Sequence, residues 1–478
     1  MIFEPVRLNE PAATGAAKRG LLSIIAIGLQ GGTRFLSNLL IGRVAGPLIN
    51  GAVASATALA FLLHTFWPSS SPGAASKFIA RARGKKDDAE VHSVTRHIAL
   101  RVVQVTGVLA VACPPLWVWV YDGQWWEGLC ISVILITVST SQFARGVHFG
   151  AGQVARGTRY DILISIIGIV TTVLLLSLGV RNLLLTLPMS LALGAYSLLC
   201  WPWTAHGTPE RALRSEIDKF ITFSALGSMA SAGMLQASQL VAAWLGPEEA
   251  ARFAPALLMV TPLSIIATAL TMALYPSMAE AQGGNDTERL RRQTDLATRG
   301  FMAVMVPSFG GMAIAARPII ELVWGHRFDQ SPALMPFFCL ALLINNVATP
   351  SVSSITSGPH RNMWYTLLLS QAGLASAIVA WLLLVQPLGV FGVALGYGIG
   401  ASVTAISLIV VAWRMYAQRW WPLFAQLVVA VAAIAGLSWW RHSSPPDHVL
   451  DLVVGTGFGL LWLGISVPTL RRLWGHRA

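Results

Sequence analysis

The stretch that decides the fold is Ile162–Val180, which reads ILISIIGIVTTVLLLSLGV and contains no charged residue. As a helix it rises about 1.5 Å per residue, enough to cross the roughly 30 Å hydrocarbon core of a bilayer. Many similar runs follow, and charged residues make up only 11% of the 478-residue chain. Soluble domains carry about 25% charged residues. The sequence therefore predicts an all-α integral membrane protein that crosses the bilayer many times.

Fourteen charge-poor runs of about 20 residues are candidate transmembrane helices. They lie near residues 21–42, 49–68, 97–120, 128–148, 161–180, 183–204, 219–245, 253–279, 299–316, 333–357, 363–385, 389–412, 420–440 and 449–469. With both termini inside, 26 of the 33 Lys and Arg residues fall in internal segments and six in external ones. This imbalance follows the positive-inside rule and predicts cytoplasmic termini. It also accounts for the net charge of +12, so nucleic-acid binding is not expected.

An internal repeat is visible at an offset of 200 residues. Gly46–Pro47 corresponds to Gly246–Pro247, and in both copies an apolar helix ends at the Gly–Pro pair. The offset spans six predicted helices, so the copies keep one orientation and predict two pseudo-symmetric six-helix bundles around a central cleft. The predicted organisation is a cytoplasmic tail, an N-terminal bundle, a cytoplasmic linker, a C-terminal bundle, two additional helices and a cytoplasmic tail. Their ranges are 1–20, 21–204, 205–218, 219–412, 413–469 and 470–478.

Arg34 places a guanidinium inside the first predicted span, with Gln30 and Asn38 one turn away on the same helix face. A cation at bilayer depth costs about 2.5–3.5 kcal/mol on insertion scales and is a functional-site hypothesis by default. A guanidinium also binds a pyrophosphate through two parallel hydrogen bonds. The alternative is a structural role, in which Arg34 extends toward the interface or pairs with a backbone carbonyl.

Other polar residues in apolar surroundings are candidate substrate contacts. They are His64 in the second span, Arg145 and His148 in the fourth, Gln236 and Gln239 in the seventh, and Asn345 and Asn346 in the tenth. Each has an ordinary alternative: a buried histidine with satisfied hydrogen bonds, a positive-inside anchor, or interhelical hydrogen bonding. The sequence leaves these alternatives open.

The acidic residues argue against a cation antiporter. All 21 are placed at helix ends or in loops, and those nearest a span are Asp161, Glu280, Glu321 and Asp451. A drug or cation antiporter needs a buried carboxylate to exchange protons or sodium. The four cysteines form no CxxC pair and fit small buried hydrophobic residues. No nucleotide-binding, metal-binding or nucleophile motif is found, which predicts a transporter without cofactor or metal rather than an enzyme.

Two stretches resemble the multidrug/oligosaccharidyl-lipid/polysaccharide (MOP) flippase superfamily. One is QLVAAWLGPEEAARF at residues 239–253, followed by Tyr275–Pro276; the other runs from Pro318–Gly325 through Thr356–Gly358 to Leu388–Ala394. Within the superfamily the chain looks most like Wzx-type polysaccharide transporters and more distantly like lipid II flippases. It departs from the family at Pro47–Asn50, where acidic or Tyr/Gly-type residues are usual.

The resemblance implies movement of a polyprenyl-pyrophosphate-linked oligosaccharide from the cytoplasmic to the outer leaflet of a bacterial inner membrane by alternating access. Helices one, two, seven and eight would line the cleft, and the last two helices would be peripheral. The implied partners are the lipid-linked substrate, membrane lipids, and the polymerase and glycosyltransferases of the same pathway. Two alternatives remain: a multidrug/cation antiporter of the same superfamily, and a membrane glycosyltransferase or polymerase that uses polyprenyl-linked sugars.

Overall fold

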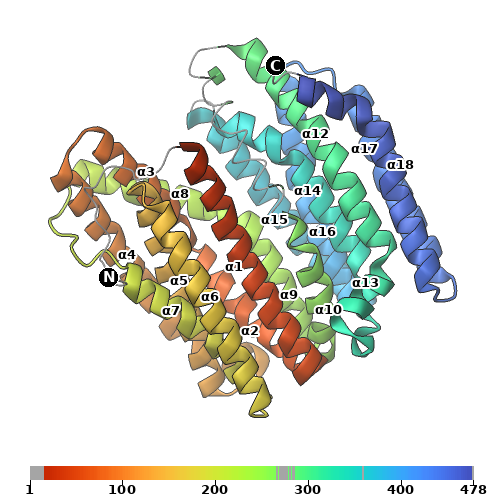
Figure 1. The fold of residues 1–478 in the computed structure, drawn as a ribbon, viewed down its shortest axis with the longest axis horizontal. Coiled ribbons are helices and arrows are strands. Elements are labelled where there is room, and N and C mark those ends of the chain that lie inside the picture. The colour runs from red at the N-terminus through yellow and green to blue at the C-terminus, as the bar shows by residue number, and fades with distance from the viewer. Residues whose placement is uncertain are drawn as a thin grey trace. The chain divides into compact units, whose positions relative to one another are not determined.

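The structure is a computed structural model that describes residues 16–264, 267, 278, 281–282, 286–357 and 360–475. The described part of the chain contains helices and no strands, which confirms the predicted all-α fold class. The chain divides into two compact units, residues 1–251 and residues 252–478. Each unit is considered separately below (Figure 1).

The first unit is built from long helices joined by short turns. These are α1 (Ala16–Ala45), α2 (Pro47–Thr65), α3 (Ser71–Gly84), α4 (Asp88–Tyr121), α5 (Trp125–Gly150), α6 (Val154–Ser177), α7 (Leu187–Cys200), α8 (Arg211–Ser228) and α9 (Met234–Leu245), with α10 (Pro247–Val260) crossing the boundary. Helix α5 packs against α2, α3, α4 and α7. Because neighbours surround it, 67% of its most apolar window is buried inside the protein. Polar side chains on α5 therefore face other helices rather than lipid.

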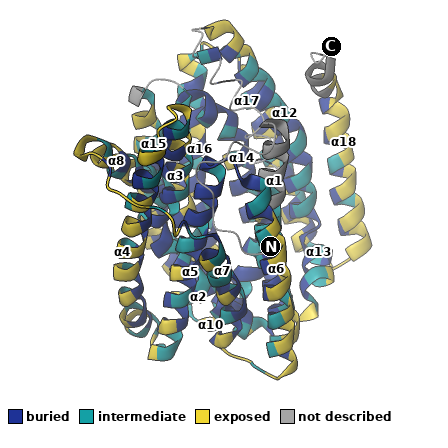
Figure 2. Cartoon of the chain, turned by 60° about the vertical axis from the view of Figure 1, so that its left-hand side comes forward, coloured by how far each residue is buried: buried dark blue, intermediate teal, exposed yellow. Residues whose placement is uncertain are grey.

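The second unit contains α12 (Thr287–Ile314), α13 (Ala316–Trp324), α14 (Met335–Thr356), α15 (His360–Leu388), α16 (Val390–Met415), α17 (Trp421–Ser443) and α18 (His448–Gly475). Helices α12 and α13 meet at a bend of 77°. Helix α18 lies along α12 (Figure 1), and Gly311 and Gly455 allow the two backbones to approach closely. Most of α18 is coloured as exposed in Figure 2, as expected for the predicted peripheral helices.

Ten helices in the described residues are long and apolar enough to cross a membrane, or eleven if the bent α12–α13 pair counts as one span. The predicted count of fourteen is not confirmed. Predicted span 219–245 is divided among α8, a π-helical turn at Met229–Gly233 and α9. Predicted span 253–279 lies partly outside the described residues. The count therefore remains a prediction.

The two Gly–Pro pairs of the sequence repeat have the same local structure. Gly46 separates α1 from α2 with φ 94° and ψ 174°, and Gly246 separates α9 from α10 with φ 142° and ψ 163°. Only glycine adopts this backbone region readily, and each following proline sits at the first helical position, where it fits. A further close approach lies one turn on, where a Cβ at Gly51 would be 2.6 Å from the backbone nitrogen of Ala251. Position 251 is the repeat equivalent of position 51, so equivalent positions of the two copies touch.

The sequence Trp67–Pro68–Ser69–Ser70–Ser71–Pro72 predicts a break at the end of the second span, and the structure has this break. Helix α2 ends at Thr65, a 3-10 turn covers Pro68–Ser70, and α3 begins at Ser71. The polar segment 77–101 carries seven Lys and Arg residues, a composition that favours a surface helix on anionic lipid. Apart from a turn at residues 85–87, it is helical. It includes most of α3, whose buried face contacts Ile217 and Ile221 of α8. This segment therefore packs on protein, and the prediction of lipid contact is untested.

The segment between α7 and α8, together with the first turns of α8, is held against α3 and α4 by polar contacts. His92 and His206 stack with ring centroids 4.4 Å apart, and Arg81 forms a two-bond ion pair with Glu216. Hydrogen bonding to Arg81 lowers the pKa of Glu216. Burial, and then the neighbouring His206, lowers the pKa of His92. The predicted linker 205–218 thus includes the first turns of α8, and the domain boundaries remain a prediction.

Candidate functional site

Arg34 of α1 lies against α2 without an ionic partner among the described residues. Its guanidinium carbon is 4.3 Å from the centre of the Phe61 ring, a cation–π contact. Its Nε atom is buried and has no hydrogen-bond partner in the described part of the chain. The charge is thus stabilised by a ring face and not by a carboxylate, which leaves hydrogen-bonding capacity for an anion.

A chain of contacts joins Arg34 of α1 to His64 of α2 and on to α5, and a second contact joins Gln30 of α1 to α5. The Phe61 ring packs edge-on to His64, with centroids 6.3 Å apart. His64 Nδ1 lies 2.9 Å from Ser139 Oγ. One helical turn before Arg34, the side-chain oxygen Oε1 of Gln30 accepts a hydrogen bond of 3.4 Å from Gln142 Nε2. We refer to Gln30, Arg34, Phe61, His64, Ser139 and Gln142 as the Arg34 cluster.

Sequence reasoning missed three members of the Arg34 cluster, namely Phe61, Ser139 and Gln142. Each has a signal in the sequence, because Phe61 is one turn before His64, and Ser139 and Gln142 belong to the polar part of α5. Asn38, in contrast, donates to the Arg34 carbonyl oxygen at 2.9 Å. This bond lies within α1, so the amide does not satisfy the guanidinium. The role of Asn38 as a substrate contact remains a prediction.

Arg145 is placed differently from expectation. Its Nε and Nη2 atoms donate to Asp161 Oδ1 at 3.0 and 2.5 Å, and the Tyr196 ring covers the guanidinium at 4.5 Å. Arg145 and Asp161 are 5% and 3% exposed. The expectation that every carboxylate lies at a helix end or in a loop was therefore wrong for Asp161, which is about two turns inside α6. A single sequence carries no signal that residues 16 positions apart on different helices will pair. Asp451 is also buried, in an ion pair with Arg441 between α18 and α17, and Glu280 lies outside the described residues.

The remaining predicted site residues are spread over both units. His148 is buried on α5, and its Nδ1 atom bonds with the Ala144 carbonyl oxygen. Gln239 of α9 donates to Ser55 Oγ of α2 at 3.1 Å, which is the interhelical bonding considered as its alternative role. Gln236 is partly buried on the same helix. In the second unit, Asn346 donates to Ser264 Oγ and the Leu342 carbonyl oxygen, whereas Asn345 is exposed.

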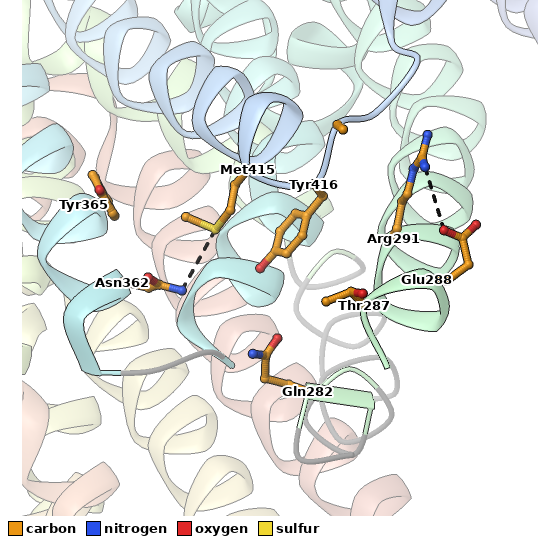
Figure 3. Close-up of a pocket in the computed structure, with 9 residues that line it drawn as sticks. Gln282, Thr287, Glu288, Arg291, Asn362, Tyr365, Met415 and Tyr416 are labelled. Carbon is orange, nitrogen blue, oxygen red and sulfur yellow. Dashed lines mark hydrogen bonds and ion pairs between the residues drawn. The ribbon is translucent and has the colours of Figure 1, made fainter. Parts of the chain in front are cut away.

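The second unit contains a pocket of about 840 Å³ that includes no predicted site residue. It is lined by the first turns of α12 and α15, the end of α16, and Gln282. Figure 3 shows the Tyr416 ring between Asn362 and Thr287, with Arg291 and Glu288 directed toward each other at one side. In the described residues, no group of three His, Cys, Asp or Glu side chains is arranged to hold a metal ion.

The family model described as lipid II flippase MurJ matches residues 208–451, just over half of the chain. The chain belongs to this family. Comparison with curated proteins finds no match. The family match confirms the resemblance to the MOP superfamily. The protein is thus a membrane transporter of the flippase type rather than an enzyme.

Solved structures of multidrug transporters share the fold. An inward-facing MATE family transporter of the MOP superfamily has a TM-score of 0.64 and 16% identity, covering 80% of this chain and 94% of that one. MATE in complex with MaL6 has a TM-score of 0.62 and 16% identity, covering 86% and 97%. MATE in the bent conformation has a TM-score of 0.60 and 16% identity, covering 89% and 98%. At this identity the likeness concerns the fold alone.

Proposed function

We propose that the protein moves a polyprenyl-pyrophosphate-linked oligosaccharide from the cytoplasmic to the outer leaflet of a bacterial inner membrane. The single observation that carries this proposal is Arg34, a partly buried guanidinium whose buried Nε atom has no hydrogen-bond partner and which has no carboxylate partner among the described residues. In our proposal the Arg34 cluster binds the pyrophosphate. The match to the lipid II flippase model supports a lipid-linked substrate.

The physical argument concerns what stabilises the charge of Arg34. A ring face at 4.3 Å contributes roughly 1–2 kcal/mol, less than the insertion cost of about 2.5–3.5 kcal/mol for an arginine at the helix centre. Charge-assisted bonds to a pyrophosphate would more than offset the difference when substrate is bound. Gln30 and His64 can add neutral hydrogen bonds from either side of the guanidinium. The prenyl chain would stay in lipid while the polar head passes through the protein.

A cation antiporter of the same fold is the second candidate, and the MATE-like fold favours it. Its chemistry requires a buried carboxylate that can release its proton and bind a cation. Asp161 is buried, but two donors of Arg145 already occupy its Oδ1 atom. A carboxylate whose charge is balanced within the protein is a poor site for a second cation. We therefore favour the flippase.

The experiment compares Arg34→Ala, Arg34→Lys and Arg34→Glu in a flipping assay normalised to the protein present in the membrane. Arg34→Ala should insert normally, because the change removes an intramembrane charge, but it should reduce flipping at least tenfold. Arg34→Lys should restore activity only in part, since an ammonium lacks the two-pronged geometry. Arg34→Glu should be the least active. Arg43→Ala is the matched control, because Arg43 is an exposed arginine at the end of the same helix.

Three results would count against the proposal. Full normalised activity in Arg34→Ala would show that the guanidinium does not bind the substrate. Equal losses in Arg34→Ala and Arg43→Ala would show that both changes act through general charge and not through a site. A fall in protein amount with preserved activity per molecule would assign Arg34 the structural role.

A further inference from the structure

The pocket in the second unit has a lining suited to a neutral polar ligand. It combines two tyrosine rings, two amides, a hydroxyl and one pair of opposite charges. The amides and the hydroxyl belong to Gln282, Asn362 and Thr287. A volume of about 840 Å³ falls within the usual range for small-molecule sites, which is roughly 300–1,000 Å³.

The hydrogen-bonding groups of the pocket are only lightly engaged by the protein. The Asn362 amide has a thioether as its described partner, Met415 Sδ at 3.9 Å, and thioether sulfur is a weak acceptor. The Tyr365 side chain is 41% exposed. Arg291 Nη1 lies 3.7 Å from Glu288 Oε2, so the charge of the guanidinium is partly balanced. The lining can thus offer donors, acceptors and ring faces, with little net charge.

The turn that closes the pocket is held in a strained conformation. Ala417 has φ 46°, a region that a non-glycine residue without a polar side chain rarely adopts. Two side-chain bonds hold this turn in place: Tyr416 donates to the Ser354 carbonyl oxygen at 2.9 Å, and Gln418 donates to the Arg291 carbonyl oxygen at 2.8 Å. Strain that neighbouring contacts maintain is characteristic of binding sites.

We propose that this pocket is a sugar-binding subsite that receives a neutral sugar unit of the lipid-linked substrate from the cytoplasmic side. A pyranose ring has an apolar face, which packs on an aromatic ring, and a rim of hydroxyls, which pair with amides. The Lys and Arg distribution assigns this end of α12 and α15 to the cytoplasm. The assignment rests on the proposed function, and it names the sugar portion of the substrate as the ligand of this pocket.

An anionic ligand fits this pocket less well than a neutral sugar. Glu288 lies beside Arg291 and would repel a phosphate that approached the guanidinium. The Arg34 cluster shows the opposite arrangement, because its cation has no carboxylate partner among the described residues. The two places therefore suit different ligand chemistries, an anion at the Arg34 cluster and a neutral sugar at the pocket.

The test uses saturation-transfer NMR on the full-length protein in lipid nanodiscs. The probes are N-acetylglucosamine and galactose, with glucose 1-phosphate as the anionic comparison. Saturation should reach the neutral sugars in the wild type and fall at least fivefold in Tyr365→Ala and Asn362→Ala. Trp364→Ala, which removes the neighbouring ring outside the pocket lining, should retain the signal. In the flipping assay, Tyr365→Ala and Asn362→Ala should raise the half-saturating substrate concentration about tenfold, as loss of one stacking or hydrogen-bonding group predicts.

Several outcomes would overturn the subsite. They are the absence of transfer to either neutral sugar in the wild type, a signal in both pocket variants that equals that of the wild type, and a stronger signal for glucose 1-phosphate that disappears in Arg291→Ala. Failure of the proposed function would give a different result. In that case Arg34→Ala would flip substrate normally while sugar binding by the pocket persisted.

Discussion

The buried ion pair of Arg145 and Asp161 allows a quantitative prediction. Asp161→Asn keeps the size of the side chain but leaves the Arg145 guanidinium buried opposite a neutral amide. Both residues are almost fully buried, and breaking such a pair costs about 3–5 kcal/mol. This cost corresponds to more than a hundredfold shift toward unfolded protein. Replacing both residues with apolar ones, Arg145→Met with Asp161→Leu, should be close to neutral or stabilising because no charge remains buried.

The assay is thermal unfolding in detergent for the wild type, Asp161→Asn, the single variants Arg145→Met and Asp161→Leu, and the double variant that combines the last two. We expect each single variant to unfold at a clearly lower temperature and the double variant to unfold near the wild type. Additive losses would refute the ion-pair reasoning, because they would mean that the two side chains do not interact. Flipping by the double variant decides the predicted substrate role of Arg145. Retained transport would limit Arg145 to holding α5 and α6 together, and lost transport in intact protein would place it in the substrate path.

Three further predictions concern other parts of the molecule. Gly51→Val should destabilise the protein by about 1–3 kcal/mol through overpacking, because a Cβ at position 51 would lie 2.6 Å from the Ala251 nitrogen. Thermal unfolding measures this loss, and an unchanged melting temperature would show that the α2–α10 contact does not form. Since the pKa of His92 is lowered, the folded state binds fewer protons than the unfolded state, so the stability that His92 contributes should decrease as pH falls below about 6.5. Hydrogen exchange of residues 204–210, expressed relative to the intrinsic exchange rate at each pH, should then accelerate between pH 7.5 and 5.5, and His92→Gln should remove this acceleration; a pH-independent relative rate in the wild type would contradict it. Finally, Asp87→Cys should react with impermeant thiol reagents only from the cytoplasm and Ser444→Cys only from outside, and labelling of both from one side would exclude the predicted topology.

The sequence predicted those features of the fold that depend on local composition. Charge-poor runs identified the helices, and Trp67–Pro68 identified the break after α2, because solvation and proline chemistry act over a few residues. The Gly–Pro repeat also predicted matching turns at Gly46 and Gly246, since the required backbone region is available only to glycine. The number of spans could not be verified in the same way. A π-helical turn divides α8 from α9, and hydropathy alone carries no signal for such a turn.

The candidate site was only partly predictable, because its chemistry depends on pairing between helices. Gln30, Arg34 and His64 were identified from one segment each, and the structure connects them through Phe61 and α5. The pairing of Arg145 with Asp161 depends on how α5 and α6 pack, which a single sequence does not encode locally. The pocket beside Tyr416 was missed for the same reason, since its walls come from the starts of two helices and the end of a third.

Arg34 and Arg145 show how the same side chain obtains two different roles from its surroundings. Both are arginines in predicted spans of one unit, and both lie under an aromatic ring. Arg145 also has Asp161, so its charge is balanced within the protein and another anion would have to displace a buried carboxylate. Arg34 has no such partner among the described residues, so an incoming phosphate would meet no internal competitor. Adding a carboxylate beside Arg34 should therefore balance its charge within the protein, as Asp161 balances the charge of Arg145.

Gln30→Glu, one turn away on the same helix face, should stabilise the fold while inhibiting flipping. The matched change Gln142→Glu on α5 tests whether a carboxylate from the opposite helix acts in the same way. Undiminished flipping in both variants would mean that the substrate does not pair with the Arg34 guanidinium.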